Sequence, residues 1–228
     1  MAADIRDSTH KAFGTFENPG VPPTVHDLRT LRSLRAKIVT ACSSISPPGL
    51  SGSTIRILTQ RLLELNDEPI PRAPVEVVAA VLSDVLGVEC SEEEMESLCR
   101  AFVRYRDDRI ILVEFIEYAR GTLPSYRSEL VVKAFSNCQP NRDNRVSEDD
   151  IVSAFDQAGA ERVNGDSGLP GRELLNSFLD SLHVYCDETQ HDFDLNDFFE
   201  YYRDVSCEVE DHEQFEDLMC STWNIELD

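Results

Sequence analysis

The stretch Gln139-Pro-Asn-Arg-Asp-Asn-Arg-Val-Ser-Glu-Asp-Asp-Ile151 contains a polar loop and the start of a helix. Val146 is the single aliphatic residue of the loop, and Ile151 follows it five positions later. Ser147 and Asp150 are spaced as a capping box, in which each side chain bonds the backbone N–H of the other residue. The stretch therefore predicts a loop that ends near Val146 and a helix that begins just after Ser147.

Two other pairs of residues have the spacing of a capping box, Ser91 with Glu94 and Asp194 with Asp197. They predict that helices also begin just after Ser91 and just after Asp194.

The five-residue interval between an apolar loop residue and an apolar helix residue recurs three more times. The other pairs are Ile70 and Val75, Ile110 and Phe115, and Phe193 and Phe198. In a calcium-binding helix–loop–helix hand, position 8 of the twelve-residue loop is apolar and pairs with a partner loop through a short β bridge, and position 12 is an acidic ligand. The intervals therefore predict four such hands. A generic bundle of capped helices is the alternative.

Several segments of the C-terminal half carry a more specific pattern. They are Arg127, the run from Glu129 to Phe135, Val146 to Ile151, Phe178 to Asp180, Asp197 to Tyr202, Val205, Ser206, Phe215, Leu218, Met219 and Trp223. These segments resemble calcyphosine and its relatives, a family of EF-hand proteins, and the resemblance extends in order over residues 25–228. It implies two EF-hand lobes, a long connection over residues 160–170, and calcium-dependent regulation in members with complete loops. Some members of the wider group are associated with cilia and flagella.

The expected fold class is all-α, with two lobes of paired EF-hands, short β bridges and an N-terminal helical extension. We expect residues 1–45 to form the extension, with a basic amphipathic helix. Residues 46–122 are expected to form a degenerate N-terminal hand pair. Residues 123–228 are expected to form the C-terminal pair with a tail helix.

The first two loops are predicted to be unable to bind calcium, which needs six to eight oxygen ligands from loop positions 1, 3, 5, 7, 9 and 12. We expect the first loop to span nine residues, 66–74, with Pro74 at position 12. The second, 106–114, is expected to be equally short. It retains Glu114, but Arg106 and Arg109 place positive charge where the ion would sit.

The third loop, 139–150, has the full length and is the candidate metal site. Its ligand positions hold Gln139, Asn141, Asp143, Arg145 through its carbonyl, Ser147 and Asp150. Only two of these side chains are anionic, and Asp at position 12 is shorter than the usual Glu. We therefore predict a vestigial loop, with an affinity no better than about 10⁻³ M. No cofactor is expected; weak calcium or magnesium binding here is the alternative.

The fourth loop, aligned on Phe193 and Phe198, would run over residues 186–197. Cys186 would stand at position 1 and His191 at position 6, and the nearby carboxylates do not follow the ligand pattern. We predict that this loop is empty. His183, Cys186 and His191 could instead begin a zinc site, but the spacing leaves one ligand missing.

Composition narrows the classes of partner. The net charge is −22, and residues 176–228 hold sixteen acids and one base, or −15, whereas residues 1–45 hold four acids and six bases, or +2. Such an acidic chain repels nucleic acids and anionic membranes. Neither a membrane span nor a secretory signal is expected, and seven scattered cysteines indicate reduced thiols. We expect a cytoplasmic protein, with the cilium or flagellum as a candidate location.

Two amphipathic segments are candidates for contact with partners. The basic helix carries the predicted partner-binding residues Leu28, Arg29, Leu31, Arg32 and Arg35, which could dock on an acidic protein such as a microtubule or axonemal component. The alternative is that this helix covers the first lobe. Phe215, Leu218, Met219 and Trp223 lie on one face of the tail helix, which is expected to fill the groove of its own lobe.

These observations predict a non-catalytic EF-hand protein that acts as a protein-binding adaptor or structural subunit. A calcium-sensing regulator that uses the third loop, with or without the fourth, is the alternative. A hydrolase built on the carboxylates from Asp204 to Glu213, or on the Cys/His cluster, has no complete constellation in the sequence.

Overall fold

The computed structural model describes residues 22–45, 53–65, 68–104, 109–163, 169–186 and 192–227. These ranges hold eleven helices and four short strands. The elements are α2 (Val25–Ile45), α3 (Thr54–Leu63), β1 (Arg72–Pro74), α4 (Val75–Leu86), α5 (Glu92–Phe102), β2 (Arg109–Ile111), α6 (Leu112–Arg120), α7 (Ser125–Asn137), β3 (Arg145–Val146), α8 (Glu148–Ala154), α9 (Gln157–Val163), α10 (Gly171–Leu182), β4 (Phe193–Asp194), α11 (Leu195–Glu208) and α12 (His212–Trp223).

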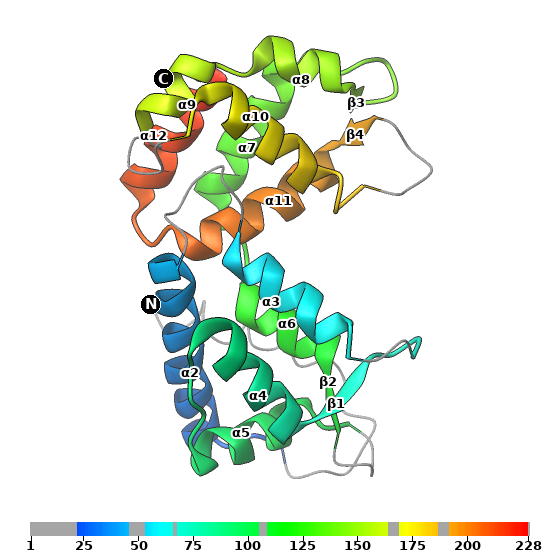
Figure 1. The fold of residues 1–228 in the computed structure, drawn as a ribbon, viewed down its shortest axis with the longest axis vertical. Helices are drawn as coiled ribbons and strands as arrows, with labels where there is room; N and C mark the ends of the chain where they lie inside the picture. The colour runs from blue at the N-terminus through cyan, green and yellow to red at the C-terminus, as the bar shows by residue number, and fades with distance from the viewer. Residues whose placement is uncertain are drawn as a thin grey trace. The chain divides into compact units, whose positions relative to one another are not determined.

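The chain divides into two compact units (Figure 1). Unit 1 comprises residues 1–45 and 54–122, and unit 2 comprises residues 46–53 and 123–228. Each unit contains two repeats of helix, short strand and helix, and the two strands of a unit pair antiparallel. The chain is thus mostly helical, with two small sheets of two strands each. Short pairings of this kind are consistent with the β bridge of EF-hand pairs.

In unit 1, helix α2 packs against α3, α4, α5 and α6. Its buried side chains are Leu31, Leu34, Ile38 and Cys42, all at most 1% exposed. They recur at intervals of three or four residues, so they form one face of the helix. The helix expected in the N-terminal extension therefore belongs to the same compact unit as residues 54–122.

The strand register of unit 1 corrects the expected first repeat. Ile110 pairs with Ala73, whereas Ile70 lies outside the strand and is 46% exposed. The equivalent interval is therefore Ala73 to Val78 instead of Ile70 to Val75. A shift of three residues keeps the same helical face, because Val75 and Val78 are both buried, so periodicity alone could not distinguish the two registers.

The corrected register also changes the lengths of the first two loops. A twelve-position count around Ala73 makes Val77 position 12 of loop one, in place of Pro74. The same count around Ile110 runs from Val103 to Glu114 in loop two. In this numbering the first two loops each have twelve positions instead of the expected nine. From here, loops one to four denote residues 66–77, 103–114, 139–150 and 186–197.

In unit 2, the expected register is observed, with Val146 opposite Phe193 and Arg145 opposite Asp194. Val146, Ile151, Phe193 and Phe198 are fully buried. Ser147 with Asp150 and Asp194 with Asp197 form complete capping boxes, as does Ser91 with Glu94 in unit 1. The starts of α5, α8 and α11 therefore follow the predicted signals.

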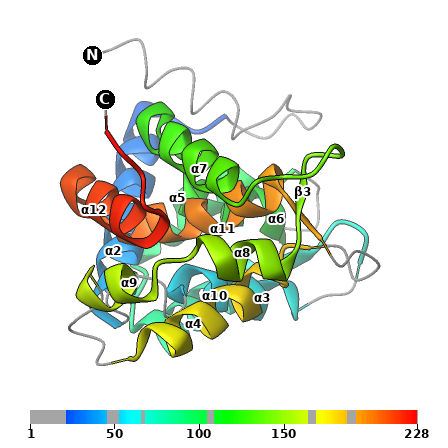
Figure 2. The ribbon, with the colours of Figure 1, turned by 90° about the horizontal axis from the view of Figure 1, so that it is seen from above.

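The tail helix α12 lies inside unit 2, against α7 and α9 (Figures 1 and 2). Phe215, Met219 and Trp223 are fully buried and Leu218 nearly so, as its apolar face predicted. The Trp223 ring packs against Phe155, Phe178 and Phe198, and its indole N–H donates to the Tyr202 hydroxyl at 2.6 Å. The aromatic rings thus form one cluster, and the indole donor has a partner.

Helix α9 occupies part of the connection that the sequence analysis left without structure, and residues 164–168 of that connection lie outside the described ranges. A Cβ built at Gly159 of α9 would lie 1.9 Å from the carbonyl oxygen of Ser221 in α12. Only a residue without a side chain permits this approach of the two backbones. Over the described residues, no helix is long and apolar enough to cross a membrane.

Candidate functional site

Loop three holds the predicted metal residues, and hydrogen bonds within the loop fix its course. Asn144, at position 6 where Gly is usual, has a left-handed backbone with φ 56°, as does Gln139 with φ 55°. Oδ1 of Asn141 accepts hydrogen bonds from the backbone N–H of Asp143 at 2.9 Å and of Arg145 at 3.1 Å. The side-chain oxygen at position 3 therefore bonds the loop's own backbone.

The carboxylate at position 12 of loop three is also engaged by the chain. Oδ2 of Asp150 accepts from the Ser147 N–H at 2.9 Å and from the Ser147 hydroxyl at 2.7 Å. These hydrogen bonds lower the pKa of Asp150 and stabilise its charged form. Gln139, Asn141 and Asp143 are exposed. The predicted ligands thus lie in one loop, but the side chains at positions 3 and 12 accept hydrogen bonds from other residues of the same loop.

In loop two, an arginine forms an ion pair with the glutamate at position 12. Nη2 of Arg104 donates to Oε2 of Glu114 at 2.6 Å, and its Nη1 donates to the carbonyl oxygen of Ala101. Arg104 is 8% exposed, so this ion pair is largely shielded from water. Burial raises the pKa of Glu114, and the charge of Arg104 opposes that rise. Arg106, which the sequence analysis placed near the ion position, lies outside the described residues.

In loop one, the acid at position 3 bridges two arginines. Glu68 lies 2.9 Å from Nη2 of Arg72 and 3.2 Å from Nη1 of Arg109. Positions 9 and 12 hold Pro74 and Val77, whose side chains carry no oxygen. Loop one therefore lacks two of the ligands that calcium needs.

Loop four repeats the arrangement of loop three at its C-terminal end. Oδ2 of Asp197, at position 12, accepts from the Asp194 N–H at 2.8 Å, and Oδ1 of Asp194 accepts from the Asp197 N–H at 3.1 Å. Burial raises the pKa of Asp197 despite this hydrogen bond. His191 and residues 187–190 lie outside the described ranges, while His183 bonds Glu148 at 2.7 Å.

The predicted partner-binding residues of α2 do not share one environment. Leu31 is fully buried in unit 1 and Leu28 is partly buried. Nε and Nη2 of Arg35 donate to the carbonyl oxygens of Tyr118 and Arg120 at the end of α6, at 3.1 and 3.2 Å. Arg29 and Arg32 are exposed. The accessible part of the predicted surface is therefore this pair of arginines.

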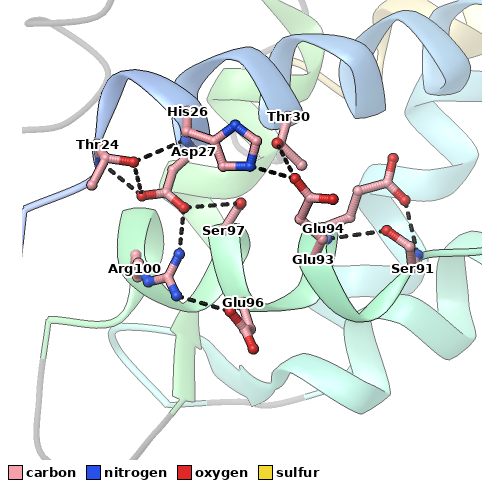
Figure 3. A network of polar contacts seen from close by, with 10 residues as sticks. All are labelled: Thr24, His26, Asp27, Thr30, Ser91, Glu93, Glu94, Glu96, Ser97 and Arg100. Carbon is pink, nitrogen blue, oxygen red and sulfur yellow. Dashed lines mark hydrogen bonds and ion pairs between the residues drawn. The ribbon is translucent and has the colours of Figure 1, made fainter.

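Sequence reasoning missed the polar network that joins α2 to α5 (Figure 3). Asp27 is fully buried and accepts from the Thr24 N–H and hydroxyl, both at 2.7 Å, from Ser97 at 3.2 Å and from Arg100 at 2.5 Å. Burial alone would raise the pKa of Asp27, but the hydrogen bonds outweigh it, and the pKa lies well below its usual range. The spacing of Thr24 and Asp27 is itself a capping-box signal.

Further polar contacts extend the network along the same two helices. Nζ of Lys37 lies 2.7 Å from Oε1 of Glu94, which also closes the capping box of α5. Nε2 of His26 lies 2.5 Å from Glu93. Polar contacts at both ends of the helix pair thus fix the position of α2 along α5.

Three of the carboxylates considered for hydrolysis have structural partners. Asp204 and Glu208 are buried on α11, where they accept from the hydroxyls of Tyr185 and Ser53 respectively. Asp211 caps α12. The seven cysteines, all of which lie within the described ranges, form no disulfide with one another. Within the described part of the chain, no group of three or more His, Cys, Asp or Glu side chains is arranged to hold a metal ion.

Arg127 is a second group whose role the sequence did not reveal. It is 3% exposed and donates to the carbonyl oxygens of Ser206 at 2.9 Å, Val209 at 2.7 Å and Asp211 at 3.0 Å. Its guanidinium also lies 4.7 Å from the centre of the Phe215 ring. Arg127 thus donates to two carbonyls at the end of α11, those of Ser206 and Val209, and to the carbonyl of the residue that caps α12.

No protein-family model matches the sequence.

Proposed function

We propose that this protein is a divergent calcyphosine-like EF-hand protein that binds other proteins without catalysing a reaction and with little or no calcium binding. The proposal rests on the residues at position 12 of the four loops. Glu114, Asp150 and Asp197 are bonded by donors of the chain itself, and Val77 has no oxygen to offer. A bidentate carboxylate at this position is central to calcium binding by a hand.

Four repeats of helix, strand and helix, joined in pairs by their strands, support the EF-hand part of the proposal. Because α2 and α12 each bury an apolar face within their own unit, both units have a packed core without an added ligand. This arrangement favours a scaffold of fixed conformation over a switch that opens with calcium. An adaptor or structural subunit is the role that suits such a scaffold.

The partner we propose is an acidic protein surface, such as one on a microtubule or axonemal component in a cilium or flagellum. The exposed guanidinium groups of Arg29 and Arg32 are the candidate contacts. A net charge of −22 disfavours binding to nucleic acids. The proposed location is the cytoplasm, including the ciliary compartment.

Calorimetric titration of the purified full chain with calcium tests the first part of the proposal. We expect no heat of binding in the micromolar range and an affinity no better than about 10⁻³ M. A micromolar site would instead support the calcium-sensing regulator. Loop three favours this second candidate, because Asn144 already adopts the left-handed backbone at position 6.

Co-precipitation from ciliated cells tests the second part. The double variant Arg29→Glu and Arg32→Glu should lose the recovered partner, whereas Arg142→Glu should retain it. Arg142 is an exposed arginine of unit 2 and serves as a control for the change of charge. Equal recovery with the double variant and with the wild-type chain would rule out these arginines as the docking site.

A further inference from the structure

In each unit, one arginine reaches across the strand pair to the neighbouring loop. In unit 2, Nη1 of Arg145 donates to the carbonyl oxygen of Asp192 at 2.6 Å, and Nη2 lies 3.4 Å from Oδ2 of Asp194. In unit 1, Nη2 of Arg109 donates to the carbonyl oxygen of Arg72 at 2.6 Å, and its Nη1 donates to Oε1 of Glu68 at 3.2 Å. Each guanidinium therefore joins one backbone oxygen and one carboxylate.

The two arginines occupy equivalent loop positions. Counted from the paired residues Ile110 and Val146, both stand at position 7 of their own loops. The carbonyls that accept from them belong to Arg72 and Asp192, which stand at position 7 of the neighbouring loops. Position 7 is the one that offers its backbone oxygen to calcium in a hand.

The carboxylates that the arginines contact also stand at calcium-ligand positions. Glu68 is at position 3 of loop one, and Asp194 is at position 9 of loop four. Each guanidinium thus contacts two of the oxygens that would face an ion in these loops. The same relation occurs in both units, although the arginine comes from loop two in unit 1 and from loop three in unit 2.

We propose that Arg109 and Arg145 act as resident cations, each of which supplies the positive charge of the neighbouring loop in place of a metal ion. This inference rests on the proposed interpretation of the repeats as EF-hands. Arginine suits the role because its planar guanidinium is always charged and presents donors that can bond two oxygens at once. The parts of loops one and four that the structure describes, residues 68–77 and 192–197, are thereby held in one conformation that does not depend on calcium.

Chemical rescue tests this role in the full-length chain. In Arg145→Ala, the amides of β3 and β4 should exchange with solvent about tenfold faster, the change expected from losing one charge-assisted hydrogen bond. Methylguanidinium at about 20 mM, far below the molar range in which guanidinium salts unfold proteins, should restore most of the protection. Sodium chloride at the same concentration should not. Arg109→Ala should respond in the same way at β1 and β2.

Arg142→Ala is the matched control, because Arg142 is an exposed arginine of the same loop as Arg145. Its strand amides should exchange as in the wild-type chain. The inference is overturned if Arg145→Ala and Arg109→Ala behave like this control. It is equally overturned if methylguanidinium restores no protection or if sodium chloride restores as much.

The rescue is performed with a chelator present, so its result does not depend on calcium. Micromolar calcium binding by the wild-type chain would refute the proposed function, whereas failed rescue would refute only the role of the two arginines. The two outcomes can therefore be told apart.

Discussion

Units 1 and 2 each join an additional helix to a pair of helix–strand–helix repeats, but different interactions hold that helix. In unit 1, α2 is fixed along α5 by Asp27 with Arg100 and by Lys37 with Glu94. In unit 2, α12 is fixed by the aromatic cluster around Trp223 and by the guanidinium of Arg127. Both helices bury an apolar face, but the polar contacts beside that face differ: ion pairs between side chains hold α2 along α5, whereas an arginine that donates to backbone carbonyls lies beside α12.

The largest expected effect is that of Trp223→Ala. The change removes a fully buried ring and its hydrogen bond to Tyr202, so the free energy of unfolding of unit 2 should fall by about 3–5 kcal/mol. Urea unfolding followed by circular dichroism measures the loss, and hydrogen exchange should locate it in unit 2. Leu227→Ala is the control, because Leu227 is 51% exposed. A loss below about 1 kcal/mol would contradict the role of the aromatic cluster.

Arg127→Met should have the next largest effect. Methionine keeps much of the apolar contact with Phe215 but leaves the carbonyls of Ser206 and Val209 without this donor. Unsatisfied buried acceptors should reduce the free energy of unfolding by about 2–3 kcal/mol. The exposed Arg142→Met serves as the control in the same urea experiment. Equal stability of the two variants would show that Arg127 does not hold α12.

Asp27→Asn should weaken unit 1 by about 2 kcal/mol, since an amide replaces a carboxylate that accepts from Arg100, Ser97 and Thr24. Arg100 is partly exposed and can regain water, which limits the cost. Hydrogen exchange should show the loss along α2 and α5 and not along α12. Asp84→Asn, at an exposed position of α4, is the control. Unchanged protection of α2 would show that the apolar face alone fixes this helix.

Acid should affect unit 1 through the same carboxylate. Because the pKa of Asp27 is lower in the folded chain than its ordinary value, the unfolded chain binds more protons near pH 4 and below, and stability falls there with falling pH. The contribution of Asp27 is complete above its unfolded pKa of about 3.9 and is lost as the pH falls below that value. Between pH 4 and pH 2, Asp27→Asn should therefore show a slope that is shallower by up to about 1.4 kcal/mol per pH unit. Identical slopes for the variant and the wild-type chain would contradict this assignment.

The repeats and helix starts could be predicted because they depend on neighbours in the sequence. The capping boxes at Ser91, Ser147 and Asp194 and the pairing of Val146 with Phe193 are all observed. The register of the first repeat could not be predicted in this way. Shifting the repeat by three residues leaves the same face of the helix buried, so the sequence fits both registers. Only the pairing with the partner strand shows that Ala73 is the residue opposite Ile110.

The long-range polar contacts were beyond the reach of the sequence. The contact of Asp27 with Arg100 spans 73 positions, and those of Arg127 with the end of α11 span about 80. The sequence does not show which arginine pairs with a given acid, because the packing of distant helices determines which of them lie close together. The ligand positions of loop three could be assigned from the sequence, but those of loop one were assigned three residues out of register. The guanidinium groups that lie against the loop ligands could not be matched to their partners.

The smallest expected effects compare the same capping box in the two units. Ser91→Ala and Ser147→Ala should each reduce stability by about 1 kcal/mol, because each removes one acceptor at a helix start. In unit 2 the partner in the box is Asp150, the position-12 acid of loop three, whereas in unit 1 Glu94 stands outside any loop. Thermal unfolding with 5 mM calcium or with a chelator should therefore give the same value for Ser91→Ala, since calcium has no ligand to gain there. Ser147→Ala should also give the same value, because Asp150 released from the box would still lack enough anionic neighbours to hold the ion. A calcium-dependent rise in the melting temperature of Ser147→Ala alone would mean that the cap keeps loop three from binding calcium, and that its other ligands are sufficient.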